Sequence, residues 1–283
     1  MSWWGKLFGG TFGMMFGGPL GALLGAALGH KFDKGLDFFK EMGGGQSRWS
    51  SPGEVERVQS AFFTATFAVM GAVAKADGHV SSHEIAMARQ IMDQMQLNAE
   101  QREIAQKLFN EGKQPQFPLD DAVEQLRQEC HRRRNLLRMF LEIQIHAAFA
   151  DGTMEERERE ILLHIATILG FSAKEFQLME RMVAAVYSFH QRQEGANRGR
   201  GKGVVSASEL QAAYELIGVS SQASDDEVKR AYRQLMSRHH PDKLVSKGLP
   251  EEMMKMATIK TQEIKSAYDL IRQSRIKVAA GEG

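Results

Sequence analysis

The residues with the clearest chemical potential lie near the C-terminus, in the run from His240 to Lys243, which reads His-Pro-Asp-Lys. Pro241 biases His240 away from the helical conformation and cannot continue a backbone hydrogen-bond ladder, so this run should form a rigid tip between two helices. The helix expected before it carries cations largely outside its apolar face. They are Lys229, Arg230, Arg233 and Arg238. Cations fixed along one helix attract and orient an acidic partner, so the chemistry expected here is the docking of another macromolecule.

Two pairs of carboxylates form a second candidate site, for a divalent cation. Asp77 with Glu84 and Asp151 with Glu158 occupy matching positions in two similar segments. An aspartate before glycine favours a tight turn, and a glutamate in a first helical turn complements the helix dipole. Each segment also offers fewer carboxylates than a calcium-binding loop needs. We therefore expect turns and helix starts, and predict no metal and no other cofactor, with metal binding left as the alternative.

Other reactive side chains do not form a recognisable catalytic arrangement. Cys130 and His131 precede the arginines at 132–134, which we interpret as a basic helix face beside a structural cysteine. His146 and His164 lie on mainly apolar helical segments and are expected to be partly buried. Neither a nucleophile with a recognisable base nor a phosphate-cradling loop is found, so we do not predict an enzyme.

The N-terminal part contains 23 residues without a charge, at 7–29. As a helix this segment would span roughly 35 Å, enough for a hydrocarbon core of about 30 Å. Its glycines recur at every fourth position, and such a stripe lets two membrane helices approach closely. The central members of the stripe are Gly9, Gly13, Gly17, Gly21 and Gly25. We predict a single transmembrane helix over residues 7–29 that contacts the lipid bilayer and pairs two copies as a homodimer.

Two other interpretations of this segment stay open: a cleaved secretory signal and a glycine-rich segment at the membrane surface. For a spanning helix, one lysine precedes the segment and several cations follow it. They are Lys6 before it and Lys31, Lys34, Lys40 and Arg48 after it. The positive-inside rule then places the N-terminus outside and the bulk of the chain in the cytoplasm of a bacterial-type inner membrane. A single cysteine agrees with a reducing compartment.

The rest of the chain predicts an all-α fold. Apolar residues recur at helical spacing from Val55 onward, and no long alternating run of β-branched residues appears. A formal net charge of +1 argues against a dedicated nucleic-acid binder. Composition shifts divide the chain into segments whose boundaries can be predicted. These are a tail at 1–6, the span at 7–29, a linker at 30–54, a helical domain at 55–190, a Gly/Arg-rich linker at 191–208, a second helical domain at 209–276 and a tail at 277–283.

The first helical domain contains an internal repeat. The sequence Ala-Asp-Gly-x-Val-x-x-x-Glu at 76–84 is echoed at 150–158, with methionine in place of valine. Each copy lies between two apolar helical runs, which indicates paired helix hairpins sharing one core. The repeat resembles the TerB-like (tellurite-resistance) helical domain over about Val55 to His190. That resemblance implies a helical bundle and no particular reaction.

The second helical domain resembles the J domain, the module that defines DnaJ-type co-chaperones. The resemblance covers about Gln211 to Arg275 and rests on elements in matching order. These are Tyr214–Val219 (YELIGV), the basic helix Val228–His239, the His-Pro-Asp-Lys run and Lys265–Leu270 (KSAYDL). It implies a helical hairpin that binds a DnaK-type chaperone and stimulates its ATP hydrolysis. By the same resemblance, His240, Pro241 and Asp242 make the essential contact and the basic helix supplies the surrounding surface.

The whole layout resembles membrane-anchored DnaJ-type co-chaperones, with the anchor first, a TerB-like domain next and a J domain last. The function expected from it is to recruit a DnaK-type chaperone to a membrane and stimulate its ATPase. The catalytic residues would then lie in the partner. An alternative from another class makes the middle domain a metal-responsive sensor or scaffold, with the J domain as an accessory.

Overall fold

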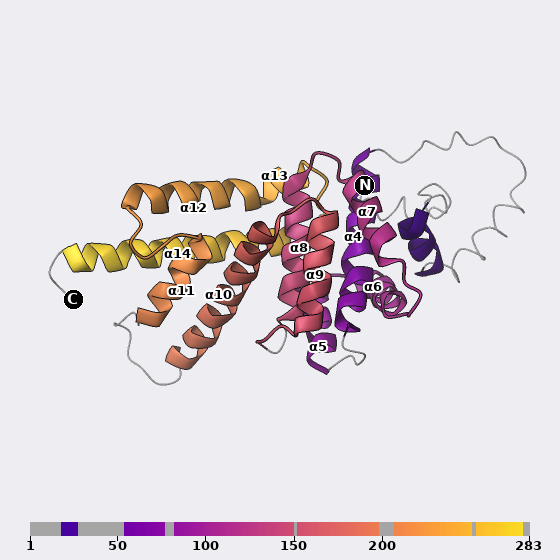
Figure 1. The fold of residues 1–283 in the computed structure, drawn as a ribbon, viewed down its shortest axis with the longest axis horizontal. Coiled ribbons are helices and arrows are strands. Elements are labelled where there is room, and N and C mark those ends of the chain that lie inside the picture. The colour runs from indigo at the N-terminus through magenta and orange to yellow at the C-terminus, as the bar shows by residue number, and fades with distance from the viewer. Residues whose placement is uncertain are drawn as a thin grey trace, which may run out of the picture.

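The computed structural model describes residues 18–27, 54–76, 82–149, 152–197, 207–250 and 253–279, and these ranges contain helices and no strands. The expected all-α fold is therefore confirmed for this part of the chain (Figure 1). The helices after the N-terminal segment are α4 (Glu54–Ala74), α5 (Ser82–Gln94), α6 (Ala99–Gly112), α7 (Leu119–Glu129), α8 (Arg134–Ala148), α9 (Glu156–Ile168), α10 (Ala173–Asn197), α11 (Ala207–Ile217), α12 (Asp225–His239), α13 (Pro241–Val245) and α14 (Met254–Ala279).

The first domain is a bundle built around α4, which is buried along almost its whole length. Its phenylalanines, Phe62, Phe63 and Phe67, are fully buried, and α6, α7, α8 and α9 pack around them. The contact between α4 and α6 is unusually close. A Cβ atom added at Gly71 would overlap the carbonyl oxygen of Phe109, and one added at Gly112 would overlap that of Ala68. Glycine is therefore required at both positions.

The long helix α10 connects the two domains. Phe176 and Met179, near its start, belong to the core of the first bundle. Met182 and Val186, farther along, belong instead to the core of the second domain, and α10 packs against α11 there (Figure 1). The helix extends to Asn197, inside the segment at 191–208 that the sequence predicts to be a linker.

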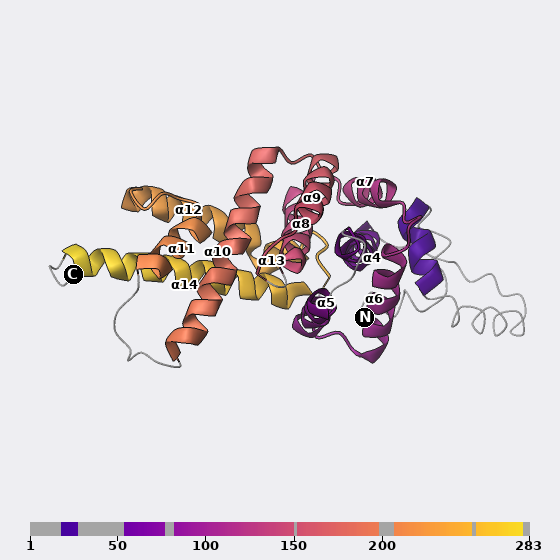
Figure 2. The ribbon, with the colours of Figure 1, turned by 60° about the horizontal axis from the view of Figure 1, so that its bottom comes forward.

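The second domain consists of α11 lying across the hairpin of α12 and α14 (Figures 1 and 2). Tyr232 on α12 stacks on Tyr268 on α14, with ring centroids 4.2 Å apart. Arg275 ties the far end of the hairpin to α11, because its Nε donates a hydrogen bond to the Tyr214 hydroxyl at 2.8 Å. The same guanidinium donates to the backbone oxygen of Ala223 at 2.6 Å, so one side chain joins three segments.

The N-terminal segment is described only over residues 18–27, which form a short helix beside α7 (Figure 2). The Leu20 backbone N–H donates to the Gln125 side-chain oxygen at 2.9 Å, and Leu24 is buried in the same core. Gly21 is buried and Gly25 half-buried, whereas Gly9, Gly13 and Gly17 lie outside the described residues. Across the described ranges, no helix has both the length and the apolar composition needed to cross a membrane.

Two expectations about side chains in the first domain are corrected. The residues at 132–134 do not form a helix face: Arg132 adopts a left-handed backbone conformation (φ 59°) in the turn after α7, and Arg134 opens α8. His164 is exposed and lies 2.8 Å from an Asp120 carboxylate oxygen, so it is not a core residue. Cys130 is fully buried, and burial raises the pKa of its thiol to about 12, in agreement with a structural role.

Candidate functional site

The candidate site is built on α12, whose start is fixed by local hydrogen bonds. A capping box is present: Glu227 N–H donates to the Ser224 hydroxyl, and Ser224 N–H donates to the Glu227 carboxylate at 2.7 Å. The Ser224 N–H also holds the pKa of the Glu227 carboxyl below its usual range. Val228 and Leu235 bury one face of α12 against α14 and α11. Since the start and the apolar face are fixed, the direction of the polar face is fixed as well.

The four predicted cations share that polar face and line one surface groove along it. Lys229, Arg230 and Arg233 are exposed, and Arg238 is half-buried near the end of the helix. Among the described residues, no ion pair is found for any of these four cations, and the charges of Lys229, Arg230 and Arg233 face solvent. The surface can therefore attract an acidic partner along the length of α12.

The His-Pro-Asp-Lys tip begins at His240, as the sequence predicts, but the residues after it form a helix and not a loop. His240 ends α12 in an extended conformation (φ −60°, ψ 123°), as expected before proline. Pro241 then occupies the first position of α13, a helix of a single turn that the sequence does not predict. Proline suits this position because its missing N–H has no helical partner there. The motif is therefore the junction of two helices and not a plain loop.

The three side chains of the motif differ in exposure. The side chains of Asp242 and His240 are 87% and 46% exposed, with the His240 Nδ1 3.9 Å from an Asp242 oxygen. Lys243 donates from its Nζ to the Ser237 hydroxyl at 2.7 Å, which ties α13 back to α12. Leu244, at the other side of α13, is fully buried. One side of α13 thus anchors the junction and the other presents polar groups to solvent.

The carboxylate pairs are only partly visible. Asp77 and Asp151 lie outside the described residues, as does the side chain of Glu84. Glu158 is buried at the start of α9, where its carboxylate accepts a hydrogen bond from the Glu155 N–H at 3.0 Å, which is a capping role. Within the described ranges, no three His, Cys, Asp or Glu side chains gather in a group that could hold a metal ion.

The sequence-based interpretation overlooked a polar stripe on α8 that faces the second domain. Arg134, Arg138, Glu142 and His146 recur at every fourth position of this mainly apolar helix, so they lie on one face. Glu142 is buried and lies 3.7 Å from His239, at the end of α12. The spacing of these charges within an apolar run was the signal that could have shown them.

Comparisons with known proteins cover most of the chain. Residues 63–181 match the family model for tellurite resistance protein TerB, and residues 212–277 match the DnaJ domain. Residues 1–45 match the co-chaperone DjlA transmembrane domain, which indicates membrane anchoring at the N-terminal end. Both resemblances inferred from the sequence, to TerB-like and J domains, are thereby confirmed. No solved structure matches the chain.

Curated relatives match over nearly their full length. The co-chaperone protein DjlA of Photobacterium profundum is 47% identical over 275 residues, which cover 96% of this chain and 99% of the relative. That of Aliivibrio fischeri is also 47% identical, covering 96% of this chain and 98% of the relative. The protein of Coxiella burnetii is 45% identical and covers 82% of this chain and 84% of the relative. With an N-terminal membrane domain, a TerB domain and a J domain in the same order, this chain belongs to the DjlA family of co-chaperone proteins.

Proposed function

We propose that this protein recruits a DnaK-type chaperone to a membrane and stimulates its ATP hydrolysis through His240, Pro241 and Asp242. The observation that carries the proposal is the groove lined by the cations of α12, which is followed directly in the chain by the motif with its exposed His240 and Asp242 side chains. Membership of a co-chaperone family and the J domain support the same role. In this proposal the protein regulates an enzyme and is not one itself.

The surface acts in two steps. Lys229, Arg230 and Arg233 attract an acidic face of the chaperone, which accelerates encounter and fixes its orientation. His240 and Asp242 then contact the chaperone from a rigid junction. If the junction binds the hydrolysis-competent conformation more tightly than the other, binding shifts the chaperone toward that conformation. The groups that cleave ATP belong to the chaperone.

The membrane part of the proposal rests on the N-terminal family match and on charge. In this proposal residues 7–29 cross a bacterial-type inner membrane once, with the N-terminus outside, because cations are more numerous after the span than before it. The helix at 18–27 then has to leave its place beside α7, where the Leu20 N–H donates to Gln125. The glycine stripe pairs two copies in the bilayer. A homodimer places two J domains at one membrane site, which raises their local concentration for the chaperone. No nucleic acid takes part.

The decisive experiment is single-turnover ATP hydrolysis by a DnaK-type chaperone with the full chain in bilayer discs. We expect wild-type protein to accelerate hydrolysis and His240→Gln to abolish the acceleration. A matched control is His131→Gln, the same substitution at an exposed histidine of the first domain. It should leave stimulation unchanged.

Folding must be compared in the same samples, by circular dichroism and thermal unfolding. His240 is exposed, so His240→Gln should unfold at the wild-type temperature. Full stimulation by a folded His240→Gln variant, or no stimulation by the wild-type protein at any concentration, would refute the proposed function.

A further inference from the structure

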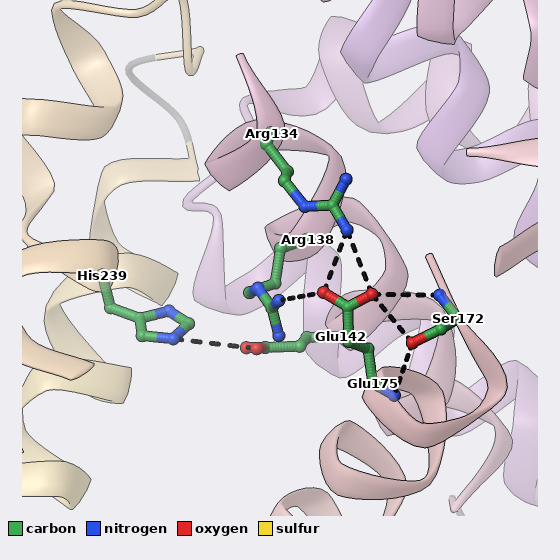
Figure 3. Close-up of polar contacts among 6 residues, drawn as sticks. All are labelled: Arg134, Arg138, Glu142, Ser172, Glu175 and His239. Atoms are coloured by element: carbon green, nitrogen blue, oxygen red, sulfur yellow. Dashed lines mark hydrogen bonds and ion pairs between the residues drawn. The ribbon is translucent and has the colours of Figure 1, made fainter. Parts of the chain in front are cut away.

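The contact between the two domains centres on one buried carboxylate. Glu142 projects from α8, and its side chain is 7% exposed. One of its oxygens lies 3.7 Å from the His239 Nε2 on α12, and the other lies 3.8 Å from the Lys260 Nζ on α14 (Figure 3 shows the contact with His239). A single side chain of the TerB domain therefore faces both arms of the J-domain hairpin. His239 directly precedes the motif.

The contact of Glu142 with Lys260 is an ion pair, whereas burial lowers the pKa of His239, which favours its neutral ring beside the carboxylate; neither contact is a hydrogen bond. Within the described part of the chain, neither Oε2 of Glu142 nor either ring nitrogen of His239 has a hydrogen-bond partner. Burying such groups is costly unless opposite charges compensate. Lys260, whose side chain is 13% exposed, supplies one compensating charge. Neutralising Glu142 would remove the carboxylate that lies 3.8 Å from this cation, and the J domain would then be held less firmly.

A second carboxylate arranges the cations behind Glu142. Glu175 on α10 accepts hydrogen bonds from Arg134 at 2.9 Å and from Arg138 at 3.3 Å (Figure 3). The Ser172 backbone N–H, followed by Arg134, lowers the pKa of the Glu175 carboxyl to about 2, so it is ionised at neutral pH. Arg138 is thus fixed between Glu175 and Glu142. The charged contact is an ordered cluster and not a chance meeting of surface side chains.

Apolar contacts continue the interface beyond the motif. Leu244, Leu249 and Met253 are fully buried and belong to the core cluster of the first domain. Gly248 approaches Val58 on α4 so closely that an added Cβ would lie 2.9 Å from a Val58 methyl group. The motif therefore lies between two attachment points, with His239 on one side and Leu244 to Met253 on the other.

This attachment leaves the motif open. Asp242 and the exposed cations of α12 face solvent while the J domain is attached. The contact with the first domain therefore does not cover these side chains. Its geometric effect is to hold the junction of α12 and α13 in one orientation relative to the first domain, and that domain follows the membrane anchor in the chain.

We propose that Glu142 is a positioning residue: from the TerB domain it holds His239 and Lys260, and so orients the His240-Pro241-Asp242 motif for the chaperone. The proposal rests on the proposed function for its effect on ATP hydrolysis. Its structural part, that Glu142 restricts the J domain to one orientation, can be measured without a chaperone.

The test substitutes Glu142→Gln, which removes the charge and keeps the shape. Spin labels on Gln114→Cys and Gln273→Cys, both exposed, report the distance between the domains in the full chain. The native Cys130 is buried with a raised pKa, so it should resist labelling. We expect one narrow distance distribution in the wild-type protein and a broad one in Glu142→Gln. Glu103→Gln, the same change at an exposed position on α6, is the matched control.

In the hydrolysis assay, Glu142→Gln should raise the concentration for half-maximal stimulation by about fivefold, the lower end of typical coupling between sites. The maximal rate should stay unchanged, since the motif itself is intact. Lys260→Met should also broaden the interdomain distance distribution and raise the concentration for half-maximal stimulation. Combining it with Glu142→Gln should add little to either change, because the two residues belong to one contact.

Each outcome has one meaning. An unchanged distance distribution in both variants would overturn the proposal, as would stronger stimulation by Glu142→Gln, which would make the contact inhibitory. If wild-type protein fails to stimulate hydrolysis while Glu142→Gln still broadens the distance distribution, the proposed function fails and the positioning of the J domain by Glu142 stands.

Discussion

The contact between α4 and α6 and the contact between α8 and α12 hold helices together by different physical means. In the first, Gly71 and Gly112 allow backbone to touch backbone. In the second, Glu142 and His239 meet at 3.7 Å without a hydrogen bond, beside a cavity of about 70 Å³ that Glu142 and Lys260 help to line. One is close-packed and the other is charged and less completely filled.

The close-packed contact lies within one domain, whereas the charged contact joins two domains. Close packing depends on shape and tolerates little change in volume. A charged contact depends on ionisation, so it responds to pH and to removal of a single charge. The experiments below test this separation, beginning with the substitution expected to have the largest effect.

Gly112→Ala should destabilise the whole protein. The added methyl group would meet the Ala68 carbonyl, and backbone cannot move aside cheaply, so we expect a loss of more than about 3 kcal/mol in the free energy of unfolding. Denaturant unfolding followed by circular dichroism measures it. Gly170→Ala is the control, because that glycine has a positive φ of 80° but no atoms near the added Cβ. It should cost only about 1 kcal/mol. If Gly112→Ala and Gly170→Ala lowered the free energy of unfolding equally, the close approach of α4 and α6 would not be the cause of the loss.

Leu249→Ala should weaken the apolar half of the domain contact. This side chain is fully buried in the core of the first domain, and a leucine-to-alanine change in such a place costs about 3 kcal/mol. We expect the loss to appear as a broadened interdomain distance together with a lower unfolding midpoint. Met254→Ala, at a neighbouring exposed position, should change stability by less than about 0.5 kcal/mol. If the interdomain distance distribution stayed narrow in Leu249→Ala, the attachment of the two domains would depend on the charged contact alone.

Local elements of the J domain could be predicted from the sequence because neighbouring residues determine them. The capping box from Ser224 to Glu227, the core spacing of Val228 and Leu235, and the end of α11 at Gly218 all appear in the structure. Each depends on residues within a few positions, which periodicity and capping rules describe well. The position of His240 at the end of α12 follows for the same reason.

Contacts between distant segments could not be predicted in this way. The stripe on α8 was visible as charges at every fourth residue, but the sequence did not reveal that Glu142 faces His239 and Lys260. The run at 132–134 was interpreted as a helix face because turns stabilised by tertiary contacts leave no periodic pattern; Arg133, for example, pairs with Glu54. The sequence also did not reveal that α10 contributes to both cores, with Phe176 and Met179 in the first and Met182 and Val186 in the second.

Arg275→Met sharpens the comparison by removing a charged contact inside one domain. This guanidinium bonds Tyr214, Ala223 and Asp225, and hydrogen bonds of charged groups contribute about 2 kcal/mol. The loss should lower the unfolding midpoint without broadening the interdomain distance. Arg272→Met, at an exposed arginine one turn away, serves as the control and should change neither quantity. A broadened interdomain distance distribution in Arg275→Met would mean that the stability of the hairpin and the attachment of the two domains depend on each other.

The smallest expected effect is a pH dependence of the domain contact through His239. Burial lowers the pKa of this histidine in the attached state; Glu142 opposes the shift, whereas Lys260, Arg138 and Arg238 reinforce it. Because the attached state resists protonation, its stability is complete above the ordinary histidine pKa of about 6.5 and declines as the pH falls below that value. One pH unit of such linkage amounts to at most about 1.4 kcal/mol, so the loss by pH 5.5 should not exceed that amount.

Interdomain distances measured between pH 8 and pH 5.5 test this effect directly, without the hydrolysis assay. The distance distribution should broaden below about pH 6.5 in the wild-type protein. His239→Gln should remove that dependence, while His131→Gln, at an exposed histidine, should retain it. Broadening that persists in His239→Gln would assign the pH response to another group at the interface. A distribution that stays narrow down to pH 5.5 would show that the apolar attachment at Leu244 and Leu249 outweighs the charged one.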